Sequence, residues 1–306
     1  MVLGFQRSTL ETPDGVSLAV FSHTPDGWDP AASPTLFLSN GLGGNLVTWK
    51  HLVERFRATH RIATWDYRGL YDSTFSPALK DRYRRGELAV ELPAHVGDAV
   101  AVLDHLGVER AVFFGWSMGV QLNFELARTQ HHRMAGLVQI CGAAGKAIAT
   151  TVFGKAGLSV IPAAMEGFKV AAERFGPTLA KMMGSSMALQ FAKGLGIVAP
   201  TLDTALAREV VGSYMRQDFE VYNRILMSLA AHDASDVLPT LDVPTLVIAG
   251  TRDPMTPKAL SEQIVNALPG AELVTLEGGS HYVPVEFPDR LNELVDRFLA
   301  TRVVPA

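Results

Sequence analysis

Short apolar runs recur along the chain and alternate with stretches in which apolar residues lie three or four positions apart. The runs are rich in β-branched and aromatic residues, which favour the pleated surface of a sheet. They comprise residues 35–39, 61–65, 111–114, 136–140, 245–249 and 272–276. Helical spacing is clearest over residues 96–106 and 260–268. This alternation predicts an α/β fold with a mostly parallel, twisted sheet and helices on both of its faces.

The beginning of the chain departs from this alternation. Two strand-like stretches meet at Asp14 and Gly15, a residue pair that is typical of tight turns. We therefore expect an antiparallel pair of strands at the edge of the sheet. The first residues contain no basic segment followed by an apolar one, so we expect no signal peptide.

A second departure lies between residues 145 and 236. This segment is rich in Ala, Leu, Phe and Met, and it contains no strand-like run of comparable quality. Because structureless loops of this length are uncommon in compact domains, we expect a mainly helical insertion. The sequence thus predicts a core made of residues 1–144 and 237–306, interrupted by an insertion over residues 145–236.

Composition narrows the possible classes of protein. Among 306 residues, 48% are hydrophobic and 19% are charged, which is enough apolar material for a large buried core. Cys141 is the single cysteine, which excludes an intramolecular disulfide framework and a multi-cysteine metal site. The formal net charge is −4 and no basic stretch offers a footprint for phosphates, so we expect no nucleic-acid partner. No uncharged stretch reaches the ~18 residues that span a bilayer, and we expect a soluble, cytoplasmic protein with no membrane partner.

The strongest chemical motif is Gly115-Trp116-Ser117-Met118-Gly119, which follows an apolar run and opens a helical pattern. A serine on a sharp strand-to-helix turn is lifted off the sheet, and the crowded turn requires glycine two positions to either side. The N-terminus of the helix that follows places positive dipole beneath a developing oxyanion. The motif therefore predicts Ser117 as a nucleophile.

A serine nucleophile needs a base, and the base needs an orienting acid. Asp253 and His281 each follow a predicted strand in the last quarter of the chain. Because parallel strands end at the same edge of a sheet, we expect both side chains near Ser117. Each residue also has a simpler interpretation: Asp253 as a cap for the helix after Pro257, and His281 as an ordinary histidine.

A glycine-rich turn earlier in the chain suggests a competing function. The run 35–39 is followed by Gly41-Leu42-Gly43-Gly44-Asn45-Leu46, and the next predicted strand ends just before Asp66. A dinucleotide-binding fold has the same order of strand, glycine turn, helix, strand and acid. Its third glycine falls on Leu46, however, where tight packing of helix on sheet needs glycine. We favour the serine motif because it explains more of the chain.

Together these motifs resemble the α/β-hydrolase fold family over essentially the whole sequence. The likeness rests on Asn40-Gly41-Leu42-Gly43-Gly44, Asp66-Tyr67-Arg68-Gly69, residues 115–119, Asp253 and His281. The chain departs from the family pattern at Asn40, where the family often has histidine, and at Tyr71, where it often has glycine.

The resemblance implies a catalytic triad of Ser117, His281 and Asp253. It also implies an oxyanion hole formed by the backbone N–H groups of Leu42 and Met118, and a helical cap over the site formed by residues 145–236. The reaction of such a triad requires no metal and no organic cofactor.

The expected reaction is hydrolysis of small to medium, predominantly apolar carboxylic esters through an acyl-enzyme intermediate. Serine at position 117 argues against the epoxide hydrolases and dehalogenases that share this fold, because they need a carboxylate nucleophile. Lactonase, thioesterase and carbon–carbon bond hydrolase activities stay open, since the same triad serves all of them. A non-catalytic receptor for a small ligand is the alternative from a different class. The sequence leaves the oligomeric state open.

Overall fold

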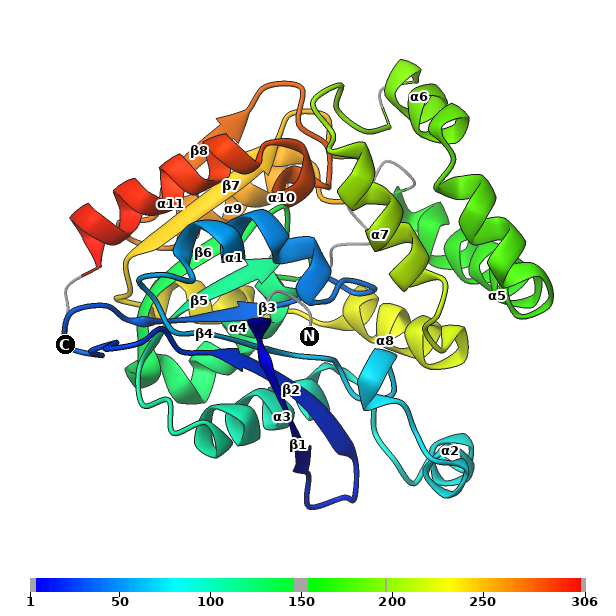
Figure 1. Ribbon diagram of the computed structural model, residues 1–306, viewed down its shortest axis with the longest axis horizontal. Coiled ribbons are helices and arrows are strands. Elements are labelled where there is room, and N and C mark those ends of the chain that lie inside the picture. The colour runs from blue at the N-terminus through cyan, green and yellow to red at the C-terminus, as the bar shows by residue number, and fades with distance from the viewer. Residues whose placement is uncertain (1–3, 146–153, 196, 304–306) are drawn as a thin grey trace.

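The computed structural model describes residues 4–145, 154–195 and 197–303. Its central feature is an eight-stranded sheet with the order β1-β2-β4-β3-β5-β6-β7-β8 (Figure 1). The strands are β1 (Gln6–Glu11), β2 (Ser17–His23), β3 (Thr35–Ser39), β4 (Ile62–Trp65), β5 (Ala111–Trp116), β6 (Met134–Ile140), β7 (Thr245–Gly250) and β8 (Glu272–Leu276). β2 pairs antiparallel with β1 and β4, whereas all other neighbours are parallel. The predicted mostly parallel sheet with an antiparallel edge is confirmed.

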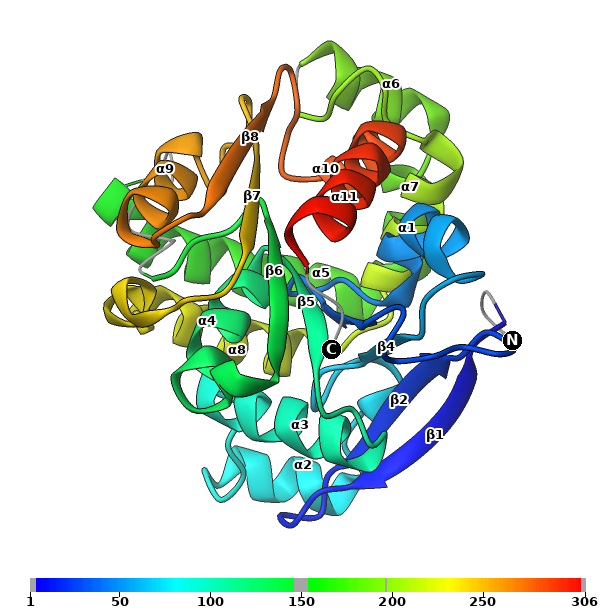
Figure 2. The same cartoon turned by 90° about the vertical axis from the view of Figure 1, so that its left-hand side faces the viewer.

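Helices cover both faces of the sheet, as Figure 2 shows. α1 (Lys50–Phe56) and α11 (Pro288–Arg302) pack on one face, and α3 (Leu92–His105), α4 (Met118–Gln130) and α9 (Lys258–Ala267) pack on the other. The short helices α2 (Pro77–Arg84) and α10 (Val283–Glu286) lie in the loops of this core. The helices predicted over 96–106 and 260–268 correspond to α3 and α9.

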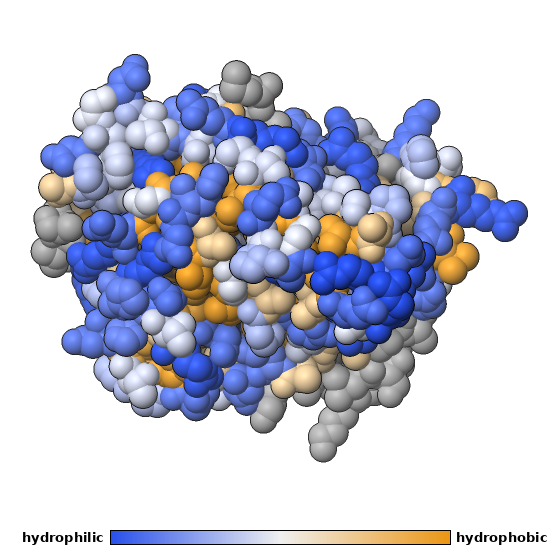
Figure 3. All heavy atoms as spheres, turned by 90° about the horizontal axis from the view of Figure 1, so that it is seen from below, coloured by the Kyte–Doolittle hydropathy of each residue, from blue (hydrophilic) through white to orange (hydrophobic). Residues whose placement is uncertain are grey.

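Successive residues of the central strands contribute to two separate hydrophobic cores. In β3, Phe37 belongs to the cluster beneath α3 and α4, whereas Leu36 and Leu38 belong to the cluster beneath α1 and α11. All three side chains are completely buried. Burial on both faces explains why the strands are continuous apolar runs rather than alternating ones. On the face that Figure 3 shows, apolar residues form a band left of centre and smaller spots elsewhere, among hydrophilic ones.

In the described part of the chain, four α-helices lie between β6 and β7. They are α5 (Gly154–Met183), α6 (Ser186–Gly194), α7 (Thr204–Tyr214) and α8 (Phe219–Ala231). Residues 146–153 and 196 of the predicted insertion are outside the described residues. The chain leaves and re-enters the core at one place: Gly145 forms a β-bridge with Asp233, and the Ala234 N–H donates to the Ala144 carbonyl at 3.0 Å. No helix in the described part of the chain is both long and apolar enough to cross a membrane.

Candidate active site

Ser117 lies at the sharp turn between β5 and α4. Its backbone angles, φ 55° and ψ −116°, are in a region that residues with a side chain rarely adopt. A Cβ on Gly119 would lie 2.1 Å from the carbonyl oxygen of Ser39, and one on Gly115 would lie 2.4 Å from the side-chain oxygen of Gln139. Since real Cβ atoms do not approach so closely, the turn requires glycine at both positions. The turn places Ser117 at the carboxyl end of the parallel strands.

The structure brings Ser117, His281 and Asp253 into one chain of hydrogen bonds. Nε2 of His281 lies 2.8 Å from Oγ of Ser117, and Nδ1 lies 2.8 Å from Oδ2 of Asp253. His281 and Asp253 are buried, whereas Ser117 is partly exposed. In this arrangement an imidazole can take the hydroxyl proton as the serine oxygen attacks a carbonyl, while the carboxylate stabilises the imidazolium.

The loop around Asp253 stabilises its ionised form. Oδ1 accepts hydrogen bonds from the backbone N–H groups of Met255 and Thr256, each at 2.8 Å, and Oδ2 accepts one from the Thr256 hydroxyl at 2.6 Å. Burial alone would raise the pKa of Asp253, but the charge and hydrogen bond of His281, together with the Thr256 bonds, lower it. Asp253 does not cap α9, whose N-cap is Pro257 without a side-chain bond.

Two side chains that the sequence analysis did not single out fix the backbone at His281. The carboxylate of Glu286, which is only 1% exposed, accepts hydrogen bonds from the Ser280 N–H at 2.8 Å, the Ser280 hydroxyl at 2.6 Å and the Ala199 N–H at 2.7 Å. The indole N–H of Trp116 donates to the carbonyl oxygen of His281 at 2.8 Å. Buried partners therefore hold the backbone N–H of the residue before His281 and the carbonyl of His281 itself.

The glycine-rich loop after β3 is a tight turn. The Gly44 N–H donates to the Gly41 carbonyl at 2.8 Å, and Gly43 has φ 80°. A type II turn requires such a φ at its third residue, which is why glycine stands there. A Cβ on Gly41 would lie 2.6 Å from the ring of Trp116, so the indole packs directly against this loop.

The two predicted oxyanion donors follow two neighbouring strands: Met118 comes directly after Ser117 at the end of β5, and Leu42 lies in the loop after β3. Met118 is the first residue of α4, where a backbone N–H has no partner within the helix. Leu42 occupies the second position of the turn described above. Among the residues that the structure describes, neither N–H donates to a protein acceptor. Both groups are thus available to bind an oxyanion.

Asn40 and Tyr71, the two departures from the family pattern, both contact this loop region. The Asn40 side chain donates to the Trp65 carbonyl at 2.9 Å and accepts from the Trp49 indole N–H at 2.8 Å. The Tyr71 hydroxyl donates to the Gly43 carbonyl at 2.5 Å. Sequence analysis noted both positions, but the residue types alone gave no hint of these partners.

Aromatic side chains from α7 and α8 lie against the same loop. A Cβ on Gly43 would lie 2.6 Å from a ring carbon of Tyr214 and 3.2 Å from one of Tyr222. Tyr214 packs edge-on against Phe219 and Tyr222, with ring centroids 5.4 and 5.6 Å apart. Burial raises the pKa of Tyr222, and it raises that of Tyr282 to about 12. These phenols are therefore neutral near pH 7 and can donate hydrogen bonds.

Asp66 and Arg68, which belong to the family pattern, brace the turn after β4. The guanidinium of Arg68 bonds Asp98 at 2.5 and 2.7 Å and Asp14 at 2.7 Å. A carboxyl oxygen of Asp66 accepts the backbone N–H of Asp72 at 3.1 Å. Burial nevertheless raises the pKa of Asp66 to about 7. These contacts give Asp66 and Arg68 a structural role in the turn after β4.

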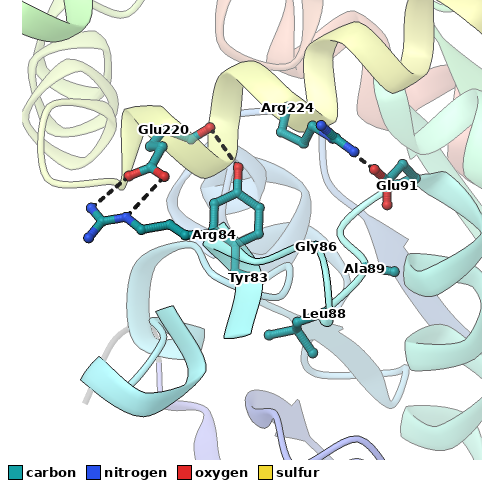
Figure 4. Close-up of a pocket in the computed structure, with 8 residues that line it drawn as sticks. All are labelled: Tyr83, Arg84, Gly86, Leu88, Ala89, Glu91, Glu220 and Arg224. Carbon is teal, nitrogen blue, oxygen red and sulfur yellow. Dashed lines mark hydrogen bonds and ion pairs between the residues drawn. The ribbon is translucent and has the colours of Figure 1, made fainter. Parts of the chain in front are cut away.

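A pocket between α2 and α8 is separate from this site (Figure 4). It has a volume of about 290 Å³ and is lined by Tyr83, Arg84, Gly86, Leu88, Ala89, Glu91, Glu220 and Arg224. Arg84 bonds Glu220 at 3.0 Å and Arg224 bonds Glu91 at 2.8 Å, so its charges are paired within the protein. Within the described ranges, no group of three or more His, Cys, Asp or Glu side chains is placed to hold a metal ion.

Comparisons with known proteins connect this geometry to a family. The family model described as alpha/beta hydrolase fold matches residues 34–288. A relative from Pseudomonas syringae pv. syringae (strain B728a), named as a carbamate hydrolase (RutD), is 28% identical over 276 residues, covering 89% of this chain and 96% of its own. The 3-oxoadipate enol-lactonase 2 of Acinetobacter baylyi (strain ATCC 33305 / BD413 / ADP1) is 27% identical, covering 87% of this chain and 88% of its own. The crystal structure of a hydrolase from Pseudomonas aeruginosa PA01 is similar with a TM-score of 0.72 and 26% identity, covering 97% of this chain and 99% of its own.

Proposed function

Because the chain belongs to the alpha/beta hydrolase fold family, we propose that it is a serine hydrolase that cleaves carboxylic esters. The observation that carries this proposal is the hydrogen-bonded chain from Ser117 through His281 to Asp253, in which both bonds are 2.8 Å long. The N–H groups of Leu42 and Met118, which have no acceptor among the residues that the structure describes, support it, since acyl transfer needs a site for the oxyanion.

The proposed reaction has two halves. His281 takes the proton of Ser117 as the serine oxygen attacks the ester carbonyl, and it then gives that proton to the departing alcohol, leaving an acyl-enzyme. Water repeats the attack with His281 as base, and the acid leaves while Ser117 regains its proton. Asp253 orients the imidazole and stabilises its charged form. The N–H groups of Leu42 and Met118 bind the oxyanion in both halves, and a single donor of this kind contributes ~3–4 kcal/mol.

Residues 145–236 are proposed to form a cap over this site. Two features support this role: four α-helices make up most of the described part of the segment, and Tyr214 and Tyr222 from α7 and α8 lie against Gly43. The substrates proposed for such a site are small to medium, predominantly apolar esters. The phenolic hydroxyls add hydrogen-bond donors to an otherwise aromatic surface.

Lactones are the second candidate substrates. The name of the Acinetobacter relative, an enol-lactonase, favours them, and a lactone is an ester whose alcohol stays attached to the acyl group. The carbamate hydrolase name of the Pseudomonas syringae relative adds carbamates to the compounds that deserve testing. Attack of a serine on the carbonyl carbon begins all three reactions.

The decisive experiment compares the wild-type protein with Ser117→Ala on a panel of p-nitrophenyl esters, lactones, thioesters and carbamates. We expect turnover that depends on Ser117. We also expect kcat/KM to rise with acyl length until the pocket is full, because each buried methylene stabilises the transition state by up to ~0.8 kcal/mol. A fluorophosphonate should label Ser117, as located by mass spectrometry. Labelling of another serine, or undiminished turnover by Ser117→Ala, would contradict the proposal. Saturable binding without turnover would favour a receptor.

A further inference from the structure

Tyr71 adopts a backbone conformation that an aromatic residue rarely has. It begins the short turn after β4, and its φ is 50°. Among the described residues other than glycine, it shares a positive φ with Ser117 and Cys141 alone. Glycine adopts this conformation without strain, whereas other residues keep it only where surrounding contacts compensate. A tyrosine at this position therefore points to a role for its side chain.

The Tyr71 side chain ends on the carbonyl oxygen of Gly43, to which its hydroxyl donates at 2.5 Å. Gly43 is the left-handed residue of the turn over residues 41–44, which carries the Leu42 N–H. Burial and the nearby charge of Asp66 raise the pKa of Tyr71, so the phenol stays protonated and remains a donor. The hydrogen bond thus joins the turn after β4 to the loop after β3.

A second link connects the same loop to α7. The side-chain amide of Asn45 donates to the Ser213 hydroxyl at 2.6 Å, and Ser213 also lies near the Tyr71 phenol, whose pKa it lowers. Ser213 is buried, with 3% of its surface exposed. Asn45, Ser213 and Tyr71 therefore form one polar cluster at the side of the glycine loop.

We propose that Tyr71 is a positioning residue, whose hydroxyl holds the Gly43 carbonyl and thereby fixes the direction of the Leu42 N–H. The proposal rests on the proposed function, because that direction matters only if an oxyanion forms there. A turn that contains three glycines has wide backbone freedom, so it needs an external contact to stay in one conformation. A fixed donor stabilises a transition state without reorganising during the reaction.

The test compares Tyr71→Phe with Tyr83→Phe, which makes the same chemical change elsewhere. The Tyr83 hydroxyl donates to the Glu220 carbonyl at 3.2 Å, away from Ser117. For Tyr71→Phe we expect kcat to fall about ten- to a hundredfold, less than for complete loss of a donor, with KM within about twofold. The affinity for a trifluoromethyl ketone analogue of the tetrahedral intermediate should fall by the same factor. Tyr83→Phe should match the wild type in both measurements.

A second variant separates the hydroxyl from the backbone. Tyr71→Gly relieves the left-handed strain but removes the phenol, so we expect it to lose kcat as Tyr71→Phe does. A normal kcat in either variant would overturn the role of the hydroxyl. Hydrogen exchange of the Gly44 amide should be faster in Tyr71→Phe than in the wild type, because the turn loses its external contact.

The outcomes distinguish this proposal from the proposed function. An active wild-type protein with a normal Tyr71→Phe variant leaves the hydrolase intact and overturns the positioning role. A wild-type protein that hydrolyses none of the panel and is not labelled at Ser117 overturns the proposed function, and the positioning role of Tyr71 with it. In that case faster exchange at Gly44 would assign Tyr71 to loop stability alone.

Discussion

The indole N–H of Trp116 donates a 2.8 Å hydrogen bond to the carbonyl oxygen of His281. The residue before the proposed nucleophile thus holds the backbone of the proposed base, although 165 positions separate them. The same indole ring packs against Gly41 and lies 5.8 Å from the imidazole, measured between ring centroids. One side chain therefore joins the serine turn, the histidine loop and the glycine loop.

Replacing Trp116 by phenylalanine keeps an aromatic ring but removes the N–H. We expect the free energy of unfolding to fall by ~1–3 kcal/mol, because the buried His281 carbonyl loses its partner. We also expect a lower kcat, because the base is less well held. Trp28→Phe is the matched control, since that indole donates at 3.1 Å to Ser33 near the surface. Urea unfolding and ester kinetics check both expectations, and equal values for the two variants would contradict them.

Asp253→Asn should reduce kcat by about 10⁴-fold, as loss of the orienting carboxylate favours the wrong imidazole tautomer. The fold should persist, because the asparagine oxygen can still accept the N–H groups of Met255 and Thr256. Steady-state kinetics and the rate of fluorophosphonate labelling measure the effect. Asp242→Asn, an exposed aspartate before β7, serves as the control. Near-normal activity in Asp253→Asn would mean that another acid orients His281.

Glu286→Gln should impair both stability and turnover. Both carboxylate oxygens of Glu286 accept hydrogen bonds, so an amide nitrogen in place of one oxygen would face another donor. We expect a loss of ~2 kcal/mol in the free energy of unfolding, and a drop in kcat that exceeds any change in KM. The exposed Glu277, which lies in the same loop, gives the control Glu277→Gln. Identical melting temperatures for the two variants would argue against this role.

Gly119→Ala should destabilise the protein by about 3 kcal/mol or more, as the new methyl group would overlap the Ser39 carbonyl and force the backbone to move. Gly167→Ala makes the same change in α5, where nothing lies within 4 Å of the added carbon. In a helix that change should stabilise by up to ~1 kcal/mol. Chemical denaturation of both variants tests the contrast. A stable and active Gly119→Ala variant would show that the serine turn is less crowded than described.

Asp66 should make stability depend on pH. Its folded-state pKa of about 7 lies above its usual value of 3.8, so the folded state holds the proton more tightly. The contribution is fully present below about pH 4 and is lost as the pH rises to about 7. At ~1.4 kcal/mol per pKa unit, the loss approaches ~4 kcal/mol. Asp66→Asn should lack this slope, whereas the exposed Asp26→Asn should retain it. The same slope in all three proteins, from urea unfolding across this range, would contradict the assignment.

The strands were predictable because burial on both faces makes each a continuous apolar run. β3 and β8 have the predicted bounds. β6 begins at Met134 rather than at residue 136, because Met134 pairs with Ala111 across a register shift in the neighbouring strand. Pairing with a neighbouring strand extends a strand beyond its own run of apolar residues. The sequence of one strand does not show which residue of another strand it will pair with.

In the candidate site, too, some residues could be predicted from the sequence and others could not. Ser117, Asp253 and His281 could be proposed because each follows a strand, and the carboxyl ends of parallel strands meet at one edge. Glu286 and Trp116 were missed because most of their partners are backbone groups, which leave no mark on residue type. The only sequence signal for Glu286 is an acid in the apolar stretch 283–287. Contacts between loops that are distant in the sequence can be identified only once the fold is known.

The β-bridge between Gly145 and Asp233 has a consequence for how such a protein can diversify. A Cβ on Gly145 would lie 2.4 Å from a carboxyl oxygen of Asp233, so the outgoing and returning chains run in direct contact. The helices between them could therefore be exchanged for others without breaking the pairing of β6 with β7. Such an exchange would remove the Ala199 N–H from Glu286 and the Ser213 hydroxyl from Asn45. Evolution or an engineer could thus change substrate preference by swapping these helices, provided that the new ones supply equivalent contacts to the two loops.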